Sequence, residues 1–121
     1  MKLEKDLMTQ VSNRLWAYQG TGQILWYSRL QCGKVRVGLH WIKLCEKGTP
    51  DWLALVKGNY GLIAFFIECK SATGNLRQEQ KDFFDKYTKI EGIHMLVMDE
   101  IEELDRWIDQ HTIDPIKEIT L

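Results

Sequence analysis

The stretch Leu62–Ile67, which reads LIAFFI, is the feature that most limits how this chain can fold. Six consecutive apolar residues leave no polar side for water, so they predict a β-strand that is buried on both faces. The run continues into Glu68, Cys69 and Lys70. Residues two apart in a strand point to the same face, so Glu68 and Lys70 should emerge side by side. Because burying charges is costly and apolar residues would serve stability equally well, this pair indicates a function.

A second carboxylate is expected opposite Glu68. The sequence predicts a strand over Asp51–Val56 and a turn over Lys57–Gly61, which leads into the strand Leu62–Lys70. With an even loop, Asp51 lies directly opposite Glu68 and on the same face, with Cβ atoms about 5 Å apart. With an odd loop, Asp51 would turn to the other face unless a bulge intervened.

The rest of the chain predicts one α/β domain of 121 residues. Apolar periodicity predicts helices and further strands, in the order α-β-β-β-β-α-β-α. The helices are expected over 3–18, 76–90 and 100–111, and the further strands over 24–31, 35–44 and 94–98. The strands 24–31 and 35–44 should form a hairpin joined at residues 32–34, and Asp99 should cap the last helix. We therefore expect a mixed central sheet flanked by helices.

Composition excludes several classes of protein. The chain is 45% hydrophobic and 27% charged, which is ordinary for a globular domain and unlike a disordered one. The longest apolar run falls far short of the roughly 18 residues that a membrane helix needs, and the first ten residues lack the apolar segment of a signal peptide. Three cysteines without a CxxC pair favour reduced thiols. A soluble cytoplasmic protein without a membrane partner is the expectation.

Charge is unevenly distributed along the chain. Residues 99–121, the acidic C-terminal helix and tail, hold two basic and eight acidic residues, whereas residues 1–98 hold 14 basic and nine acidic ones. A basic body is compatible with a polyanion bound on one side, and an acidic helix that is merely solvated explains the pattern equally well. Four cations are candidate phosphate contacts: Arg29, Arg36, Lys43 and Lys47.

Asp51, Glu68 and Lys70 suggest a metal-dependent hydrolytic site. Two converging carboxylates repel each other unless a cation lies between them, and hard oxygen ligands favour Mg²⁺ or Mn²⁺. The backbone carbonyl of Cys69 could add a ligand, and Lys70 could stabilise the charge that builds on a phosphate. The alternative is a Glu–Lys surface pair at a strand end, which contributes about 0–1 kcal/mol and does not require Asp51.

The sequence allows two interpretations of the role of Glu4. Its i+4, i+7 and i+11 neighbours are Met8, Val11 and Leu15, so Glu4 opens an apolar stripe and would face inward. Alternatively, it is an acid in the first helical turn that complements the helix dipole.

These residues resemble a known nuclease family. Pro50-Asp51, a gap of sixteen residues and then Glu68-Cys69-Lys70 form the PD-(D/E)xK pattern. The residues around it resemble the VRR-NUC branch, the virus-type replication-repair nucleases; they are Gly48, Pro50, Asp51, Ile67, Glu68, Cys69, Lys70, Gly74, Leu76 and Gln80. In that branch a Gln follows the motif Lys by about ten positions, as Gln80 does, and an early helix commonly offers a Glu, as Glu4 does. The resemblance implies that both belong to the site.

The resemblance also implies a fold and an activity. The fold would be restriction-endonuclease-like, similar to the archaeal Holliday-junction resolvases, and the activity would depend on a divalent metal and no small-molecule cofactor. Small stand-alone members are similar to virus or phage proteins that dimerise and act on branched DNA, in which case the chain would work in the cytoplasm of the host cell. The expected dimer seam would use exposed apolar residues, with Trp16, Trp26, Trp41 and Trp107 as candidates.

Together these features predict a metal-dependent DNA endonuclease that is selective for branched DNA such as four-way junctions. The same features are compatible with two alternatives. One is a catalytically silent DNA-binding or assembly module with the same fold. The other is a restriction-type or flap nuclease of the same superfamily.

Overall fold

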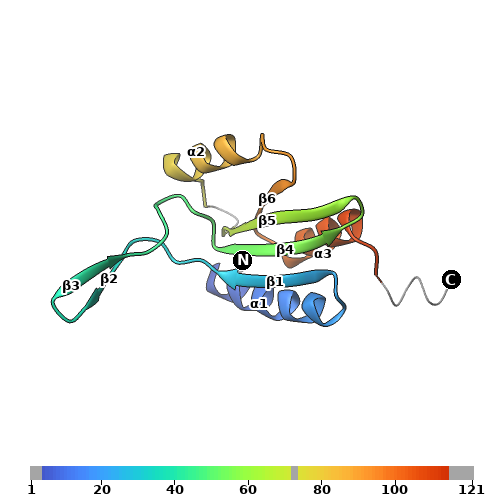
Figure 1. Ribbon diagram of the computed structural model, residues 1–121, viewed down its shortest axis with the longest axis horizontal. Coiled ribbons are helices and arrows are strands. Elements are labelled where there is room, and N and C mark those ends of the chain that lie inside the picture. Colours follow the sequence, from blue (N-terminus) through green and yellow to red (C-terminus); the bar gives the residue numbers. More distant parts are fainter. Residues whose placement is uncertain (1–3, 72–73, 115–121) are drawn as a thin grey trace.

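Residues 4–71 and 74–114 are described by a computed structural model, and they form three helices and six strands (Figure 1). The elements in chain order are α1 (Glu4–Gly20), β1 (Ile24–Arg29), β2 (Lys34–Val37), β3 (His40–Lys43), β4 (Trp52–Gly58), β5 (Gly61–Cys69), α2 (Gln78–Tyr87), β6 (Ile93–Met98) and α3 (Ile101–His111). The expected α/β class and the order of the helices along the chain are confirmed, whereas residues 35–44 form parts of two strands instead of one.

Four strands form the central sheet, in the order β1-β4-β5-β6. The pairs β1–β4 and β4–β5 are antiparallel and β5–β6 is parallel, so the predicted mixed sheet is confirmed. Strands β4 and β5 are joined by Asn59 and Tyr60, and Trp52 pairs with Ile67. This is the register expected for an even loop.

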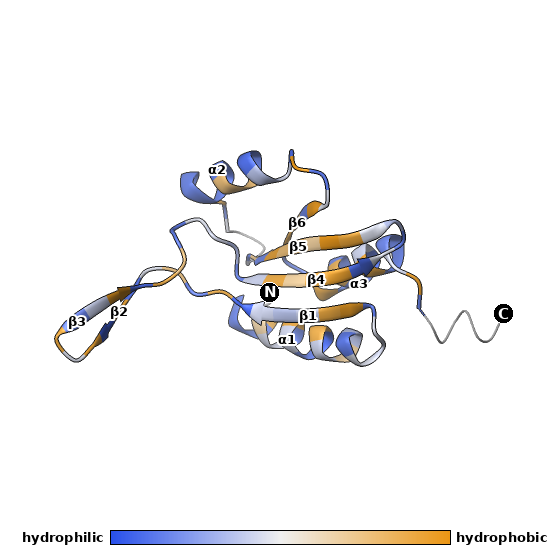
Figure 2. Ribbon diagram, in the orientation of Figure 1, coloured by the Kyte–Doolittle hydropathy of each residue, from blue (hydrophilic) through white to orange (hydrophobic). Residues whose placement is uncertain are grey.

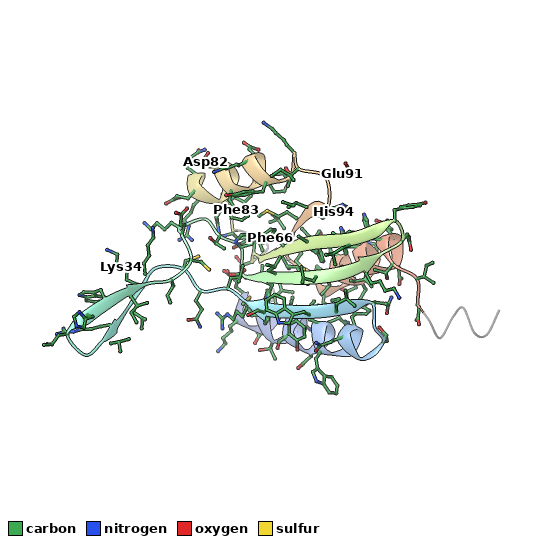
Figure 3. All side chains as sticks on the ribbon, in the orientation of Figure 1. Lys34, Phe66, Asp82, Phe83, Glu91 and His94 are labelled. Atoms are coloured by element: carbon green, nitrogen blue, oxygen red, sulfur yellow. The ribbon has the colours of Figure 1, made fainter. Side chains whose placement is uncertain are left out.

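Helices cover both faces of the sheet. Phe65 stacks on Trp107 of α3 with ring centroids 3.5 Å apart, whereas its neighbour Phe66 meets Phe83 of α2 edge-on at 5.2 Å (Figure 3). Because successive residues of a strand point to opposite faces, α3 and α2 lie on opposite sides of β5. Helix α1 joins α3 on its side, where the Tyr18 hydroxyl donates a hydrogen bond to Asp105.

The main core lies between the sheet and the helices α1 and α3. Figure 2 shows apolar residues concentrated along β4 and β5, the two central strands. The buried apolar side chains of the core come from all these elements: Leu7, Val11, Leu15, Ile24, Trp52, Ala54, Val56, Phe65, Ile67, Cys69, Met98, Ile101, Leu104, Trp107 and Ile108. None of the described helices is long and apolar enough to cross a membrane.

The prediction of one strand over 35–44 that pairs with 24–31 is wrong. The chain reverses at Gly38, whose φ of 62° favours glycine, and Val37 pairs with His40. Strands β2 and β3 therefore form a separate two-stranded ribbon, which projects from the body (Figure 1). Strand β1 pairs with β4 instead.

Three smaller expectations also need correction. Helix α2 starts at Gln78 rather than at residue 76, because Arg77 is extended and its backbone N–H donates a hydrogen bond to the Gln80 side chain; the helix also ends earlier than residue 90, at Tyr87. The cap of α3 is Glu100 rather than Asp99. Trp107 is buried, only 9% exposed, so it cannot belong to an exposed dimer seam. Residue 3 and the C-terminal residues 115–121 lie outside the described residues.

Candidate active site

Asp51 and Glu68 come together where β4 and β5 meet α2. Trp52 pairs with Ile67, so one further step of the antiparallel ladder puts Asp51 opposite Glu68. The Asp51 carboxylate is held in place by the backbone N–H of Cys69, which donates to Oδ2 over 2.8 Å. The hairpin thus brings together two carboxylates that are 17 positions apart in the chain.

Glu68 is buried and has partners from two elements. It is 3% exposed, and Gln80, also 3% exposed, donates from Nε2 to Glu68 Oε1 over 2.9 Å. Lys70 Nζ lies 3.9 Å from the same oxygen. The expected side-by-side position of Glu68 and Lys70 is confirmed, and Gln80 is in direct contact with Glu68. This carboxylate is therefore in contact with a residue of α2 and with Lys70, which directly follows β5.

The two carboxylates resist ionisation. Burial, followed by the charge of Asp51, raises the pKa of Glu68 to about 7 against the partly compensating charge of Lys70. Burial also raises the pKa of Asp51, although the Cys69 N–H, Lys70 and Arg29 oppose this rise. The cations of the protein therefore do not offset the desolvation of the pair. An additional positive charge at this site would stabilise both ionised carboxylates.

A polar cavity of about 360 Å³ opens over this pair. Asp51, Glu68 and Gln80 line it together with two arginines, Arg29 from the end of β1 and Arg77 from the start of α2. The remaining lining residues are Leu30, Gln31, Cys32 and Thr49. The cavity thus combines carboxylates that can hold a cation with guanidinium groups that can bind an anion.

Arg77 was missed in the sequence analysis, although a signal for it was present. It stands three positions before Gln80 at the start of a helix, and residues with that spacing lie on the same side of the first turn. Once Gln80 is a candidate, Arg77 is therefore a candidate as well. No ion pair of Arg77 is found among residues 4–71 and 74–114.

Gly48 sets how closely the segment before Asp51 approaches α2. Its φ is 93°, and a Cβ at this position would lie 2.3 Å from the backbone oxygen of Glu79. Only glycine fits this approach without displacing backbone. The glycine in the Gly48-x-Pro50-Asp51 stretch therefore has a structural reason, since it lets the Asp51 loop lie against the helix that carries Gln80.

The other candidate residues are exposed. Glu4 is exposed at the start of α1, which does not fit the expected inward position, yet its charge contributes to the raised pKa of Glu68 and Cys69. Of the four candidate phosphate contacts, all are exposed, but only Arg29 lines the cavity. Arg36 and Lys43 are on the ribbon, and Lys47 Nζ lies 4.0 Å from Glu79 Oε1.

The donor set fits a hard divalent cation. Within the described part of the chain, no three His, Cys, Asp or Glu side chains converge as a group that could hold a metal. Mg²⁺ usually takes only one or two carboxylates and keeps several waters, so Asp51 and Glu68 are sufficient for it. Burial raises the pKa of both acids, and a bound cation would favour their ionised forms. A zinc site, which needs three or four side-chain ligands, fits less well.

Comparison with known proteins adds no family to this picture, because no family model, no curated protein and no solved structure matches the chain.

Proposed function

We propose that this protein is a Mg²⁺- or Mn²⁺-dependent endonuclease that hydrolyses phosphodiester bonds in DNA. The observation that carries the proposal is the convergence of Asp51 and Glu68 in a polar cavity, with Lys70 Nζ 3.9 Å from Glu68 Oε1. Paired carboxylates, a lysine and two cavity-lining arginines are the groups that phosphodiester hydrolysis uses. The resemblance to the VRR-NUC pattern supports the same reading.

Each residue has a role in this proposal. When bound, the cation supplies Lewis-acid polarisation of the phosphate and neutralises its charge. Asp51 and Glu68 would hold the cation together with the Cys69 carbonyl, and Gln80 keeps the Glu68 carboxylate oriented through its 2.9 Å hydrogen bond. Lys70 stabilises the negative charge that develops as water attacks.

The two arginines bind the substrate in this proposal. Arg29 and Arg77 line the cavity from two different elements, so they can bind phosphates near the bond that is cut. Glu4, exposed at the start of α1, acts only through its charge.

We further propose a restriction-endonuclease-like fold of the resolvase kind, a C2 homodimer and a branched DNA substrate. The sheet of three antiparallel strands and a parallel fourth, with helices on both faces, is compatible with that fold. Two sites related by a two-fold axis would cut a four-way junction symmetrically. Trp16 and Trp26, 72% and 47% exposed, are the tryptophans on the body that remain available for a seam. The reaction needs no small-molecule cofactor and would take place in the cytoplasm.

Cleavage of labelled DNA tests the proposal. The purified protein is incubated with a four-way junction, a flap and a plain duplex of equal length, in Mg²⁺, Mn²⁺ or EDTA. We expect metal-dependent cleavage with preference for the junction, and a loss of about 100-fold or more in Asp51→Ala, Glu68→Ala and Lys70→Ala. Glu102→Ala, which removes an exposed carboxylate of α3, is the matched control and should retain activity.

The outcomes separate the alternatives. Binding without any nicking would replace the nuclease with a silent DNA-binding module. Preference for flaps, or sequence-specific cutting of the duplex, would support the nuclease activity and reject the four-way junction as the preferred substrate. Full activity of Glu68→Ala would reject the site itself. Sedimentation at micromolar concentration measures the proposed dimer independently.

A further inference from the structure

The ribbon formed by β2 and β3 has two unlike faces. Cross-strand partners lie on the same face of a ladder, as do residues two apart along a strand. Lys34 pairs with Lys43 and Arg36 with Trp41, so these four side chains form one face, which we call the cationic face. The other face carries Val35, Val37, His40 and Ile42.

The ribbon is anchored at its root and open along its length. Leu44 N donates to Gly33 O over 2.8 Å, and Cys45 N donates to Gln31 O over 2.9 Å. Beyond this root every residue of β2 and β3 is exposed, and the ribbon extends away from the body to its turn at Gly38, with Lys34 at the end next to the root (Figures 1 and 3). An isolated two-stranded ribbon is marginally stable in water. A ribbon of this kind is therefore suited to being completed by a partner.

The charge of the ribbon selects a polyanion as that partner. Residues 34–43 contain three cations and no carboxylate. In the described chain the ribbon cations make one ion pair, between Lys43 Nζ and Glu46 Oε1 at 3.8 Å, and both side chains are exposed. Trp41, 65% exposed, lies on the same face, opposite Arg36 and two positions from Lys43. Phosphates attract such a face, and the indole can pack against sugars or bases.

The root of the ribbon adjoins the candidate active site. Gln31 and Cys32, which lead into β2, line the cavity that contains Asp51 and Glu68. Cys32 precedes Lys34 by two positions, and its Sγ donates to the carbonyl of Thr49, another cavity residue. A partner held along the ribbon would therefore extend to the carboxylates.

We propose that the ribbon lies with its cationic face in the major groove of B-form duplex DNA, next to the bond that is cut. The major groove is about 12 Å wide and admits a two-stranded β-ribbon. Four residues per strand span about 13 Å, so the ribbon would cover about four base pairs. A-form RNA has a major groove too narrow for side chains to read, which makes B-form DNA the occupant. The inference rests on the proposed action on DNA and names which part of the substrate must be duplex.

The test is a binding measurement that does not depend on cleavage. Fluorescence anisotropy with a labelled blunt DNA duplex in EDTA, over a range of salt concentrations, compares the wild-type chain with two triple variants. The first, Lys34→Gln with Arg36→Gln and Lys43→Gln, removes the charges of the cationic face. The second, Val35→Thr with Val37→Thr and Ile42→Thr, changes the opposite face with β-branched residues and is the matched control. All six positions are exposed residues of the ribbon, so thermal unfolding should be the same in both variants.

We expect the first variant to bind the duplex at least about 30-fold more weakly, and the slope of log affinity against log salt to fall by about 2–3, since each phosphate contact contributes about 0.9. The control should bind within about threefold of wild type. An RNA duplex of the same sequence should bind more weakly than DNA and respond little to the first variant.

Equal losses in the two variants, an unchanged salt slope, or equal binding of RNA and DNA would each overturn the inference. Its failure is distinct from failure of the nuclease proposal. If the protein cleaves DNA in the presence of metal, but removing the charges of the cationic face does not weaken duplex binding, only the ribbon contact is rejected. If removing those charges strongly weakens duplex binding in EDTA, but the protein does not cleave DNA in Mg²⁺, only the nuclease proposal is rejected.

Discussion

Gln80 Nε2 donates a 2.9 Å hydrogen bond to Glu68 Oε1, while Gln80 Oε1 accepts a 2.8 Å bond from the backbone N–H of Arg77. One buried amide therefore caps the start of α2 and orients the carboxylate at the end of β5. Both polar ends of this side chain are satisfied, as burial requires. The position of the candidate site and the start of the helix are thus set by the same residue.

Replacing Gln80 should separate its two roles. Gln80→Leu leaves the Arg77 N–H and the buried Glu68 without this partner, so the free energy of unfolding should fall by about 1–3 kcal/mol. Gln80→Glu keeps an acceptor for Arg77 but adds a carboxylate beside Glu68, so stability should fall in EDTA and recover with Mg²⁺ by more than it does in wild type. Urea unfolding with and without Mg²⁺ measures both.

The control for Gln80 is Gln78→Leu, an exposed position on the same helix, which should change stability by less than about 0.5 kcal/mol. If Mg²⁺ stabilised the Gln80→Glu and Gln80→Leu variants equally, the carboxylates would not share a cation.

The stability of the metal-free protein should depend on pH through Glu68. Its pKa rises from 4.5 to about 7 on folding, so the unfolded chain ionises first as pH increases. The unfolded state then holds fewer protons than the folded state, and stability falls as pH rises from about 4.5 to 7. Urea unfolding in EDTA across this range should show a smaller fall in Glu68→Gln than in wild type. Glu102→Gln, at an exposed carboxylate, should show the same fall in stability as wild type. If Glu68→Gln shows the same fall as well, Glu68 is not the cause of the pH dependence.

Metal binding should release protons near neutral pH. Because the pKa of Glu68 is about 7, a sizeable fraction of this group is protonated at pH 6.5 and must lose its proton to bind a cation. Titration calorimetry with Mn²⁺ in two buffers of different ionisation enthalpy measures the release. The number of protons released should be smaller at pH 8.5. The Asp51→Asn variant should neither bind Mn²⁺ nor release protons. Binding that releases no protons at pH 6.5 would argue that the cation lies elsewhere.

Gly48→Ala should be more harmful than a glycine change elsewhere. Its φ of 93° disfavours a side chain, and a Cβ would meet the Glu79 carbonyl at 2.3 Å. We expect a loss of about 1–3 kcal/mol in the free energy of unfolding, with weaker metal binding because the Asp51 loop moves away from α2. Gly20→Ala, at the end of α1 with nothing within 4 Å, should be neutral or slightly stabilising. Equal melting temperatures of the two variants would contradict this account.

The sequence by itself determined the central hairpin, and it reduced the position of the two carboxylates to whether the loop is even or odd, which the structure shows to be even. Strand identity depends on the apolar run Leu62–Ile67, and register depends on the loop between Gly58 and Gly61, both of which are local. An even loop was sufficient to put Asp51 opposite Glu68, because side chains alternate along a strand. The inward residues of α1 and α3 followed from helical periodicity for the same reason.

Tertiary structure alone decided which segments meet across the chain. Residues 34–43 have the composition of a strand, and the turn at Gly38 together with the pairing of β1 with β4 made them a projecting ribbon. Trp107 is buried because Phe65 stacks on it, and Arg77 reaches the cavity because Gln80 bonds to Glu68. The turn at Gly38 is local, whereas the pairing of β1 with β4, the stacking of Phe65 on Trp107 and the bond between Gln80 and Glu68 join residues far apart in sequence, whose contact free energies local periodicity does not encode.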